Sequence, residues 1–252
     1  MLDGHTSEDD QQGRRLRARV LSAMAIAAPH PGEAGPTGVL NRLCRTIVTD
    51  LGAMGAAVNL MAGPSHAQAV VGMSDDKSAV VDDLQFTVGE GPCHDALRTG
   101  RPVHSSDLGT ETRWPGYCSA AQEHGVLAVY AFPLQVGAVS LGVLDVYDSR
   151  RRVLDERALG RALAYADIAT ESLLHSSGDD TRFIDPGLRT ALGSRAQIYQ
   201  AQGMVKVDND ISLNEAMIRI RAFAYGNRRA IADVAHDIVE GTLVLPTTAS
   251  RL

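Results

Sequence analysis

The chain has 252 residues, 44% hydrophobic and 21% charged, which is the mixture of an ordinary globular protein. Its formal net charge of −6 argues against a protein that is basic throughout and coats nucleic acid by charge alone. No apolar run reaches the ~18–20 residues that cross a bilayer, and the acidic, polar N-terminus has no apolar signal region. We therefore expect a cytoplasmic protein without a membrane partner.

The N-terminal residues 1–36 are predicted to be an extension that is partly disordered and partly helical. Residues 1–13 are polar and expected to be disordered, whereas 14–28 have a helical apolar stripe. Proline and glycine make 28–38 a predicted linker. From Thr37 an amphipathic helix is expected, with apolar residues spaced three and four apart: Leu40, Leu43, Cys44, Ile47 and Leu51.

The next hundred or so residues change to short β-rich segments separated by turn residues. Strands are predicted at 56–61, 68–73, 84–88, 101–105, 126–134 and 140–148, and short helices at 92–100 and 114–125. In the last strand Asp145 and Tyr147 alternate with apolar residues, as on a sheet with one covered face. A long helix is expected at 154–175, lined by Leu159, Leu163, Ala166, Ala169 and Leu173. The order helix, antiparallel sheet, helix predicts an α+β domain over 37–175.

A polar linker at 176–186 leads to an all-helical segment, 187–245. Asp185 can cap a helix that has Pro186 in its first turn. Ser212 and Glu215 have the spacing of a capping box that opens a second helix. A third helix is predicted over 228–240, with Gly241 at its end. Three helices of this length predict a small all-α bundle.

The charge is divided unevenly along the chain. Residues 187–252 have a formal charge of +2 and residues 1–186 a charge of −8. Arg219, Arg221, Arg228 and Arg229 fall within eleven positions, with Tyr225 and Asn227 among them. Arginines beside an exposed aromatic suit RNA loops, in which bases stack on the ring and arginine holds phosphates. A solvated arginine face on a small bundle is the alternative interpretation.

Three motifs in the C-terminal segment resemble those of the ANTAR domain. They are R-x-x-I-x-x-A-x-G-M from Arg195 to Met204, S-x-x-E-A-M-x-x-[IL]-R from Ser212, and N-x-x-x-x-x-D-V-A from Asn227. The resemblance implies RNA binding and transcription antitermination, in which the domain holds an RNA with two hexaloops and disfavours a terminator hairpin. It makes these eight residues the RNA-binding candidates: Gln200, Lys206, Arg219, Arg221, Tyr225, Asn227, Arg228 and Arg229.

The segments 84–108 and 113–148, with the long helix that follows, resemble a GAF domain of the kind fused to ANTAR in actinobacterial regulators. That resemblance implies an antiparallel sheet flanked by helices and a sensor of an unknown small-molecule or redox signal, but it names no ligand or cofactor. Candidate pocket residues are Cys93, His94, Trp114, Tyr117 and Tyr130, each of which could instead be structural. Gly89-Glu90-Gly91-Pro92 is predicted to be a tight turn rather than a phosphate cradle.

Three functions are compatible with this sequence. The first is a regulator, a homodimer paired along helix 154–175, that binds RNA under control of the sensor. The second is a thiol-dependent enzyme similar to the GAF-type free methionine sulfoxide reductases, although Cys44, Cys93 and Cys118 are widely separated and belong to no CxxC motif. The third is a small-molecule receptor that signals to a protein partner. We assign no catalytic residue and no metal site, and expect the thiols to be reduced.

Small residues in the C-terminal segment are expected at close helix contacts. Ala201, Ala216 and Ala235 fit crowded crossings, and Gly203, which lowers helix propensity by about 1 kcal/mol, needs a reason to be there. Close packing and access for RNA are both reasons, and close packing is favoured. Arg195 could pair with an acidic residue instead of binding RNA.

Overall fold

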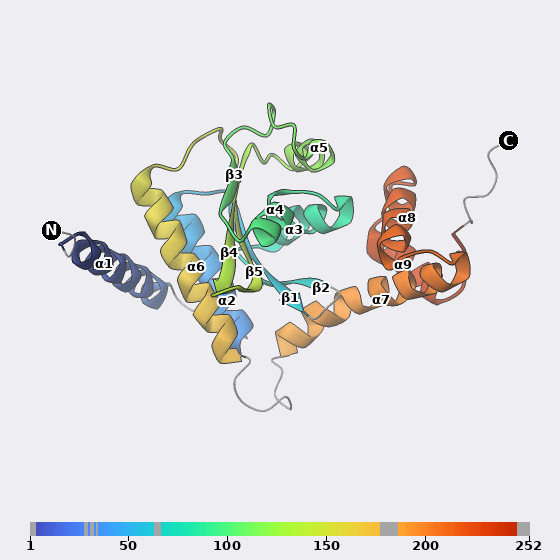
Figure 1. Cartoon of the computed structure of the whole chain (residues 1–252), viewed down its shortest axis with the longest axis horizontal. Helices are drawn as coiled ribbons and strands as arrows, with labels where there is room; N and C mark the ends of the chain where they lie inside the picture. Colours follow the sequence, from blue (N-terminus) through green and yellow to red (C-terminus); the bar gives the residue numbers. More distant parts are fainter. Residues whose placement is uncertain are drawn as a thin grey trace.

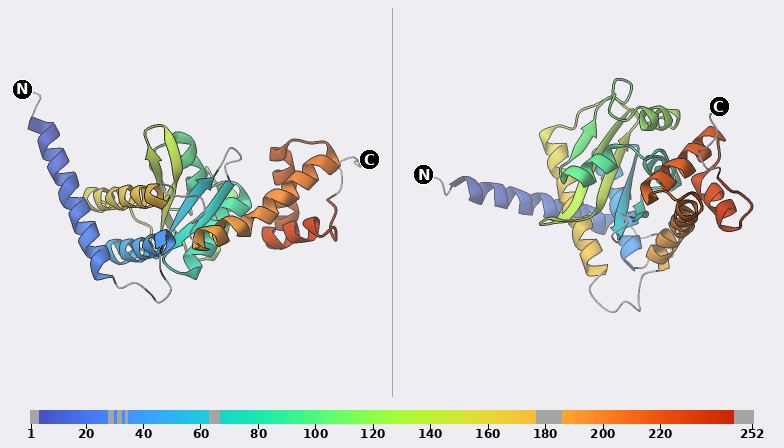
Figure 2. Two further views of the ribbon diagram at one scale, coloured as in Figure 1. Left: turned by 90° about the horizontal axis from the view of Figure 1, so that it is seen from below. Right: turned by 45° about the vertical axis from the view of Figure 1, so that its right-hand side comes forward.

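A computed structural model of the chain describes residues 4–27, 30, 33, 35–62, 67–176 and 186–245. Residues 35–176 form a domain around a sheet, called the sheet domain below, and residues 186–245 form three helices, called the helical bundle (Figure 1). The first helix, α1 (Gly4–Ile26), lies at one end of the molecule and the helical bundle at the other (Figure 2). The predicted fold class, an α+β domain followed by an all-α bundle, is confirmed.

Five antiparallel strands form the sheet in the order β2-β1-β5-β4-β3. They are Gly55–Ala62 (β1), Ala67–Met73 (β2), Val103–Ser105 (β3), Ala128–Val136 (β4) and Val139–Asp148 (β5). β4 and β5 form a hairpin in which Ala128 pairs with Asp148. Five of the six predicted strands are therefore confirmed to within two residues.

The sixth predicted strand, 84–88, is wrong, because this segment is the end of helix α3, Asp76–Val88. The Asp75 side chain caps the helix by accepting a hydrogen bond from the Ser78 amide at 2.7 Å, and Gly89 ends it with a φ of 84°. The buried positions of α3 have helical spacing, but three of the five are polar: Ser78, Val81, Asp82, Gln85 and Phe86. An apolar pattern could not reveal this helix.

Helices cover both faces of the sheet, although the alternation in β5 predicted a single covered face. Helices α2 (Gly35–Leu51) and α6 (Glu156–Ser176) pack on one face, and α3, α4 (Pro92–Thr99) and α5 (Pro115–Glu123) cover the other. Asp145 and Tyr147 are therefore 0% and 1% exposed. A buried carboxylate in a strand requires polar partners, so we expect a polar cluster on this second face.

Helix α1 spans Gly4–Ile26, so the prediction of disorder over 1–13 is wrong from Gly4 onward. Val20 and Met24 are buried in the same core as α2 and α6, and Leu16 packs against that core. Arg17 of α1 pairs with Glu171 of α6. The N-terminal extension is therefore a helix docked on the sheet domain.

The face by which helix α6 contacts α1 and α2 agrees with the predicted one in part, because three of the five predicted residues are buried: Ala166, Ala169 and Leu173. Ala162 is also buried, but Leu159 and Leu163 are 39% and 40% exposed. The alanine-rich face allows α6 to lie close to the sheet. The two leucines are left on the outside.

The helical bundle consists of α7 (Pro186–Asn209), α8 (Leu213–Gly226) and α9 (Ile231–Val239). The predicted cap Asp185 lies outside the described residues. The Ser212 hydroxyl accepts a hydrogen bond from the Glu215 amide at 3.1 Å as predicted, while the Glu215 carboxylate accepts one from Arg219. Helix α9 begins three residues later than predicted, because Arg228 has a φ of 52° that no helix contains.

The small residues of the bundle have different roles. Ala201, Ala216 and Ala235 are completely buried, which confirms the predicted close packing. Gly203 is different, because a Cβ atom built on it would meet no heavy atom within 4 Å. Close packing therefore does not explain Gly203, and the alternative, access for RNA, remains a prediction.

Replacing Gly203 with alanine is expected to raise the free energy of unfolding by roughly 0.5–1 kcal/mol, because alanine has the higher helix propensity. Thermal unfolding followed by circular dichroism measures the change. Gly160→Ala is the matched control on α6, where the new Cβ would lie 3.3 Å from Leu16 Cδ1 and the gain should be smaller. A lower stability for Gly203→Ala than for the unchanged chain would contradict this account.

Within the described ranges, no helix is long and apolar enough to span a membrane.

Candidate functional site

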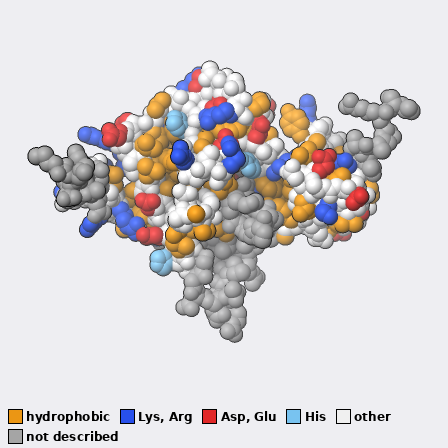
Figure 3. Space-filling model, viewed as in Figure 1, with side chains coloured by type: hydrophobic (Ala, Val, Ile, Leu, Met, Phe, Trp, Pro, Cys, Tyr) orange, Lys and Arg blue, Asp and Glu red, His pale blue; other side chains and the backbone are white. Residues whose placement is uncertain are grey.

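Five of the eight RNA-binding candidates are exposed on the helical bundle, and one of these five, Asn227, also bonds within the bundle. Gln200 and Lys206 are exposed on α7, Tyr225 is 78% exposed near the end of α8, and Arg228 lies in the α8–α9 turn. On the face of the bundle seen in Figure 3, acidic and basic side chains are mixed rather than separated. The best-placed pair for nucleic acid is therefore Tyr225 with Arg228, an aromatic ring and a cation separated by one turn of chain.

Three of the candidates make contacts that hold the bundle together. Arg219 donates hydrogen bonds to Glu215 at 3.2 Å and to the Asn209 side chain at 3.1 Å. Arg229 pairs with Asp237 at 2.6 Å and so links the α8–α9 turn to α9. Asn227 ends α8, and its amide donates to the Phe223 carbonyl at 2.8 Å. The structure thus gives these three side chains intramolecular partners.

Arg221 faces the sheet domain. Its guanidinium carbon lies 5.3 Å from the centre of the Phe86 ring of α3, and a Cβ on Gly89 would lie 2.6 Å from its Nη1 atom. The Nε atom of Arg221 is buried and has no hydrogen-bond partner among the described residues. Burial is the main cause that lowers the pKa of Arg221 from its ordinary value.

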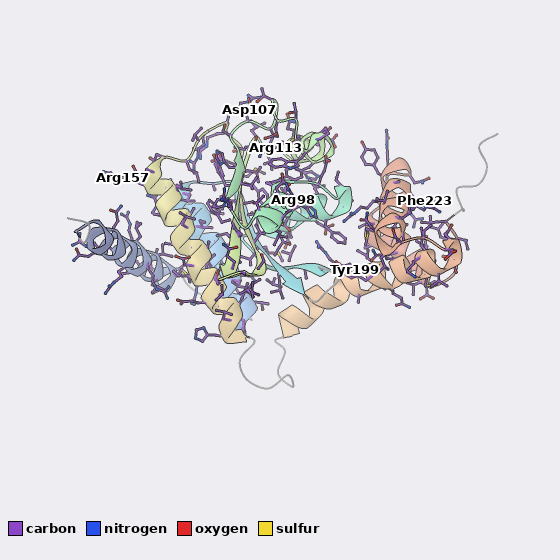
Figure 4. The ribbon with its side chains drawn as sticks, viewed as in Figure 1. Arg98, Asp107, Arg113, Arg157, Tyr199 and Phe223 are labelled. Carbon is purple, nitrogen blue, oxygen red and sulfur yellow. The ribbon has the colours of Figure 1, made fainter. Side chains whose placement is uncertain are left out.

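Arg195, near the middle of α7, makes an ion pair between the two domains. It is buried and donates to the Asp83 carboxylate of α3 at 2.7 Å, which confirms the predicted acidic partner. Its guanidinium carbon also lies 4.0 Å from the centre of the Phe86 ring, and Tyr199 meets that ring edge-on at 6.3 Å. Tyr199 is drawn at the side of the bundle that faces the sheet domain (Figure 4).

A cleft of about 630 Å³ lies beside these contacts, between the end of α3, the start of α5 and helix α8. Arg221 and Tyr225 line it from the bundle, and Glu90 and Gly116 from the sheet domain. Glu90 Oε1 accepts hydrogen bonds from the Gly116 and Tyr117 amides at 2.7 and 3.2 Å. The predicted tight turn at 89–92 therefore has an additional role, because the Glu90 carboxylate caps the start of α5.

The predicted sensor residues do not all line one pocket. Tyr130 lies on the opposite face of the sheet from Tyr117, because successive side chains of β4 point to opposite faces and Tyr130 packs against α2 and α6. The prediction that Tyr130 lines one pocket together with Tyr117 is therefore wrong. Trp114 is buried beside Tyr117, and its indole donates to Asp95 at 3.0 Å. The Nε2 atom of His94 lies 3.0 Å from the Gln85 carbonyl.

A cluster of polar side chains is buried between the sheet and α3. Asn59 of β1 donates to Asp82 at 2.7 Å and to Asp145 of β5 at 3.3 Å, and the Tyr147 hydroxyl donates to Asp82 at 2.6 Å. Three buried atoms around it have no partner among the described residues: Asp145 Oδ1, Gln85 Nε2 and the Tyr117 hydroxyl. Gln85 Oε1 accepts from the Cys93 amide at 2.8 Å, which places two predicted pocket residues, Cys93 and Tyr117, at this cluster.

Burial governs the protonation of the cluster. It raises the pKa of Asp145 well above its ordinary value, and the neighbouring Asp82 raises it further. Burial also raises the pKa of Asp82, although hydrogen bonds from Tyr147 and Asn59 oppose the shift. Because Asp82 receives two hydrogen bonds, from Tyr147 and Asn59, the pKa of Asp82 is raised less than that of Asp145.

The three thiols are buried and His94 is half-buried, and in each case burial favours the neutral form. Burial raises the pKa of the Cys44 and Cys93 thiols, and it raises that of Cys118 to about 11. Burial likewise lowers the pKa of His94 from its ordinary value. Within the described ranges, all three cysteines are free thiols and no metal-binding group of His, Cys, Asp or Glu occurs.

Sequence reasoning missed Asp82, Asp83, Phe86 and Asn59. All but Asn59 lie on α3, in or beside the segment taken for a strand. The one available signal was Asp145, a carboxylate in the middle of an otherwise apolar strand.

Comparisons with known proteins match both parts of the chain. A family model described as GAF domain matches residues 33–171, and one described as ANTAR domain matches residues 187–239. Comparison with curated proteins gives no match.

Solved structures similar to the chain include several GAF domains. That of an Acinetobacter phosphoenolpyruvate-protein phosphotransferase is 9% identical and has a TM-score of 0.50, over 66% of this chain and 95% of the other. That of the Coxiella burnetii phosphotransferase is 14% identical with a TM-score of 0.50, over 66% and 94%. A type II free methionine-R-sulfoxide reductase from Thermoplasma acidophilum is 9% identical with a TM-score of 0.45, over 56% and 93%. At these identities the likeness to the two phosphotransferase domains shows the GAF fold alone.

Proposed function

We propose, from the premise that this chain belongs to the GAF–ANTAR regulators, that it is a signal-responsive transcription antitermination regulator that binds RNA through its helical bundle. The observation that carries the proposal is the match of 187–239 to the ANTAR model, on a bundle that exposes Tyr225 beside Arg228. A solvent-exposed aromatic ring has little structural purpose of its own. Beside a cation it forms a surface on which a base of an RNA loop can stack.

The proposed RNA has two hexaloops, each held by one bundle of a homodimer. Linking the two bundles makes the second binding event intramolecular and strengthens the complex without a new contact. The exposed Leu159 and Leu163 on α6 supply an apolar face that a second copy could cover. Light scattering of the purified chain tests the dimer independently of RNA.

The proposed signal acts at the buried polar cluster of Asn59, Asp82, Asp145 and Tyr147. Buried polar atoms without partners cost free energy, and three such atoms surround this cluster in the described structure. A small polar ligand, or ordered water, would satisfy them. This supports the cluster as the place where the sensor domain recognises its signal.

Crosslinking the protein to RNA in its native cell, followed by folding of the recovered leader sequences, tests the proposed function. We expect paired hexaloops that overlap terminator hairpins to recur among the recovered leaders. If paired hexaloops are no more frequent among the recovered RNAs than in an uncrosslinked control, the proposal is contradicted.

The enzyme alternative predicts a reactive thiolate, and the structure offers little support for one. Thiolates are the nucleophiles of thiol chemistry, and burial raises the pKa of all three cysteines. We therefore expect no thiol-dependent reduction of free methionine sulfoxide by the purified chain. Turnover that disappears in a Cys93→Ser variant but persists in Cys44→Ser would favour the enzyme instead.

A receptor that signals to a protein partner remains the second alternative. It requires no nucleic-acid contact at Tyr225 or Arg228. The effect of replacing these residues on RNA binding, treated in the Discussion, therefore distinguishes it from the regulator.

A further inference from the structure

Helix α3 has two adjacent functional faces, about 100° apart around the helix axis, because each residue of one face is followed in sequence by a residue of the other. Asp82 and Gln85 face the buried polar cluster of the sheet domain, whereas Asp83 and Phe86 face the helical bundle. Phe86 is buried in the same apolar cluster as the core residues of the bundle. One rigid helix therefore contacts both the sensor cluster and the bundle.

Arg221, a predicted RNA-binding residue, is partly covered by the sheet domain. Arg221 packs against Phe86 and Gly89, and its buried Nε has no partner among the described residues. A buried donor without a partner costs free energy, whereas the same guanidinium in contact with a phosphate would form charge-assisted hydrogen bonds. The docked position is therefore an unfavourable place for Arg221, and other contacts must hold it there.

Those other contacts come from α7. The ion pair between Arg195 and Asp83 and the packing of Arg195 and Tyr199 on the Phe86 ring fix the bundle to α3. Asp83 remains 47% exposed on its side chain, so the pair is reachable by solvent and can be broken without unfolding either domain.

RNA approaching the docked bundle would meet the sheet domain. Arg221 and Tyr225 form one wall of the cleft, and the opposite wall carries the Glu90 carboxylate. Residues 1–186 have a formal charge of −8, which repels a phosphate backbone. A nucleic acid that bound all the predicted residues would first require the two walls to separate.

We propose that the outer face of α3, formed by Asp83, Phe86 and Gly89, is a docking surface for the chain's own helical bundle that withholds Arg221 from RNA. The inference rests on the proposed RNA-binding function and adds its regulation. A signal at Asp82 would act on the same helix that carries Asp83 and Phe86. Movement of α3 would then weaken the contact with Arg195 and release Arg221.

Charge reversal in the full chain tests the docking surface. Asp83→Arg places like charges together and should open the interface, while the double variant Asp83→Arg/Arg195→Asp should restore the pair. We expect Asp83→Arg to bind an RNA with two hexaloops about 5- to 20-fold more tightly than the unchanged chain. The double variant should return towards the original Kd. Hydrogen exchange of the amides in 84–89 and 219–225 should be faster in the single variant only.

Asp76→Arg is the matched control, because Asp76 is exposed on the same helix and its reversal adds the same charge. Phe86→Ala opens the interface without adding charge, should Asp83→Arg fail to fold. If Asp83→Arg exchanges faster but binds the RNA no more tightly than Asp76→Arg does, then docking does not withhold Arg221 from RNA. The proposed RNA binding itself would be unaffected by that result. Unchanged exchange in both opened variants would overturn the docking surface. If no variant binds RNA, both the proposed function and the withholding of Arg221 from RNA are overturned. The hydrogen-exchange rates would still show whether the bundle docks on α3.

Discussion

Replacing Tyr225 with alanine should weaken binding of a two-hexaloop RNA by roughly 5- to 100-fold, because stacking of one base on an aromatic ring contributes about 1–3 kcal/mol. Tyr225 is 78% exposed and packs on little of its own bundle, so folding should be unaffected. Titration with fluorescently labelled RNA measures the change. Tyr225→Phe keeps the ring and should bind within about twofold of the original chain.

The neighbouring Arg228 gives this prediction an electrostatic counterpart. Arg228→Asn suits the left-handed backbone at this position and removes the charge, so the slope of log Kd against log salt should fall by about 1. Arg101→Asn, an exposed change on the sheet domain, should leave the slope unaltered. If the Tyr225→Ala and Arg228→Asn variants both bind RNA as the original chain does, the result would favour a receptor with a protein partner.

The second large effect is expected for Asp145→Asn, which should stabilise the protein at neutral and alkaline pH. Folding raises the pKa of Asp145, whereas in the unfolded chain this carboxyl ionises above a pH of about 3.9. As the pH rises beyond that value, the unfolded state loses its proton first and stability falls. The amide has no charge to bury, so the variant should gain roughly 1–3 kcal/mol at pH 8.

Thermal unfolding between pH 5 and pH 8 checks this result. The Tm of Asp145→Asn should exceed that of the original chain by about 2–4 °C per kcal/mol and should depend less on pH. Asp208→Asn, on an exposed position of α7, is the control and should change neither. A lower Tm for Asp145→Asn at every pH would mean that the carboxylate has a stabilising partner, such as a bound cation.

The helical bundle could be predicted from sequence because its signals are local. Ser212 caps α8 through a neighbouring amide, and Gly241, with a φ of 73°, follows α9 where a left-handed residue was expected. The strands of the sheet were found for a similar reason, since alternation and turn residues lie within a few positions of one another.

Helix α3 could not be predicted in the same way. Its inward face carries Asp82 and Gln85, so the periodic signal that normally marks a buried helix was polar. Nothing local shows that these groups find partners on β1 and β5, more than twenty and sixty positions away. The wrong strand at 84–88 and the missed polar cluster have this one cause.

Prediction of the candidate site from the sequence was limited because the site depends on contacts between distant segments. Charge and spacing grouped Arg219, Arg221, Arg228 and Arg229, but the structure separates them by partner. Arg219 and Arg229 pair within the bundle, Arg221 packs on the sheet domain, and Arg228 is exposed. Replacing Arg219 and Arg221 together would therefore alter packing as well as any RNA contact, whereas Tyr225 and Arg228 test RNA binding without that complication.

The most direct test of the central claim is a titration of the full chain with RNA that has two hexaloops, compared with the same RNA in which one loop is removed. The account predicts saturable binding to the two-loop RNA that weakens with salt, and at least about tenfold weaker binding to the one-loop RNA. Equal Kd values for the two RNAs, or no saturable binding to either at low salt, would contradict it.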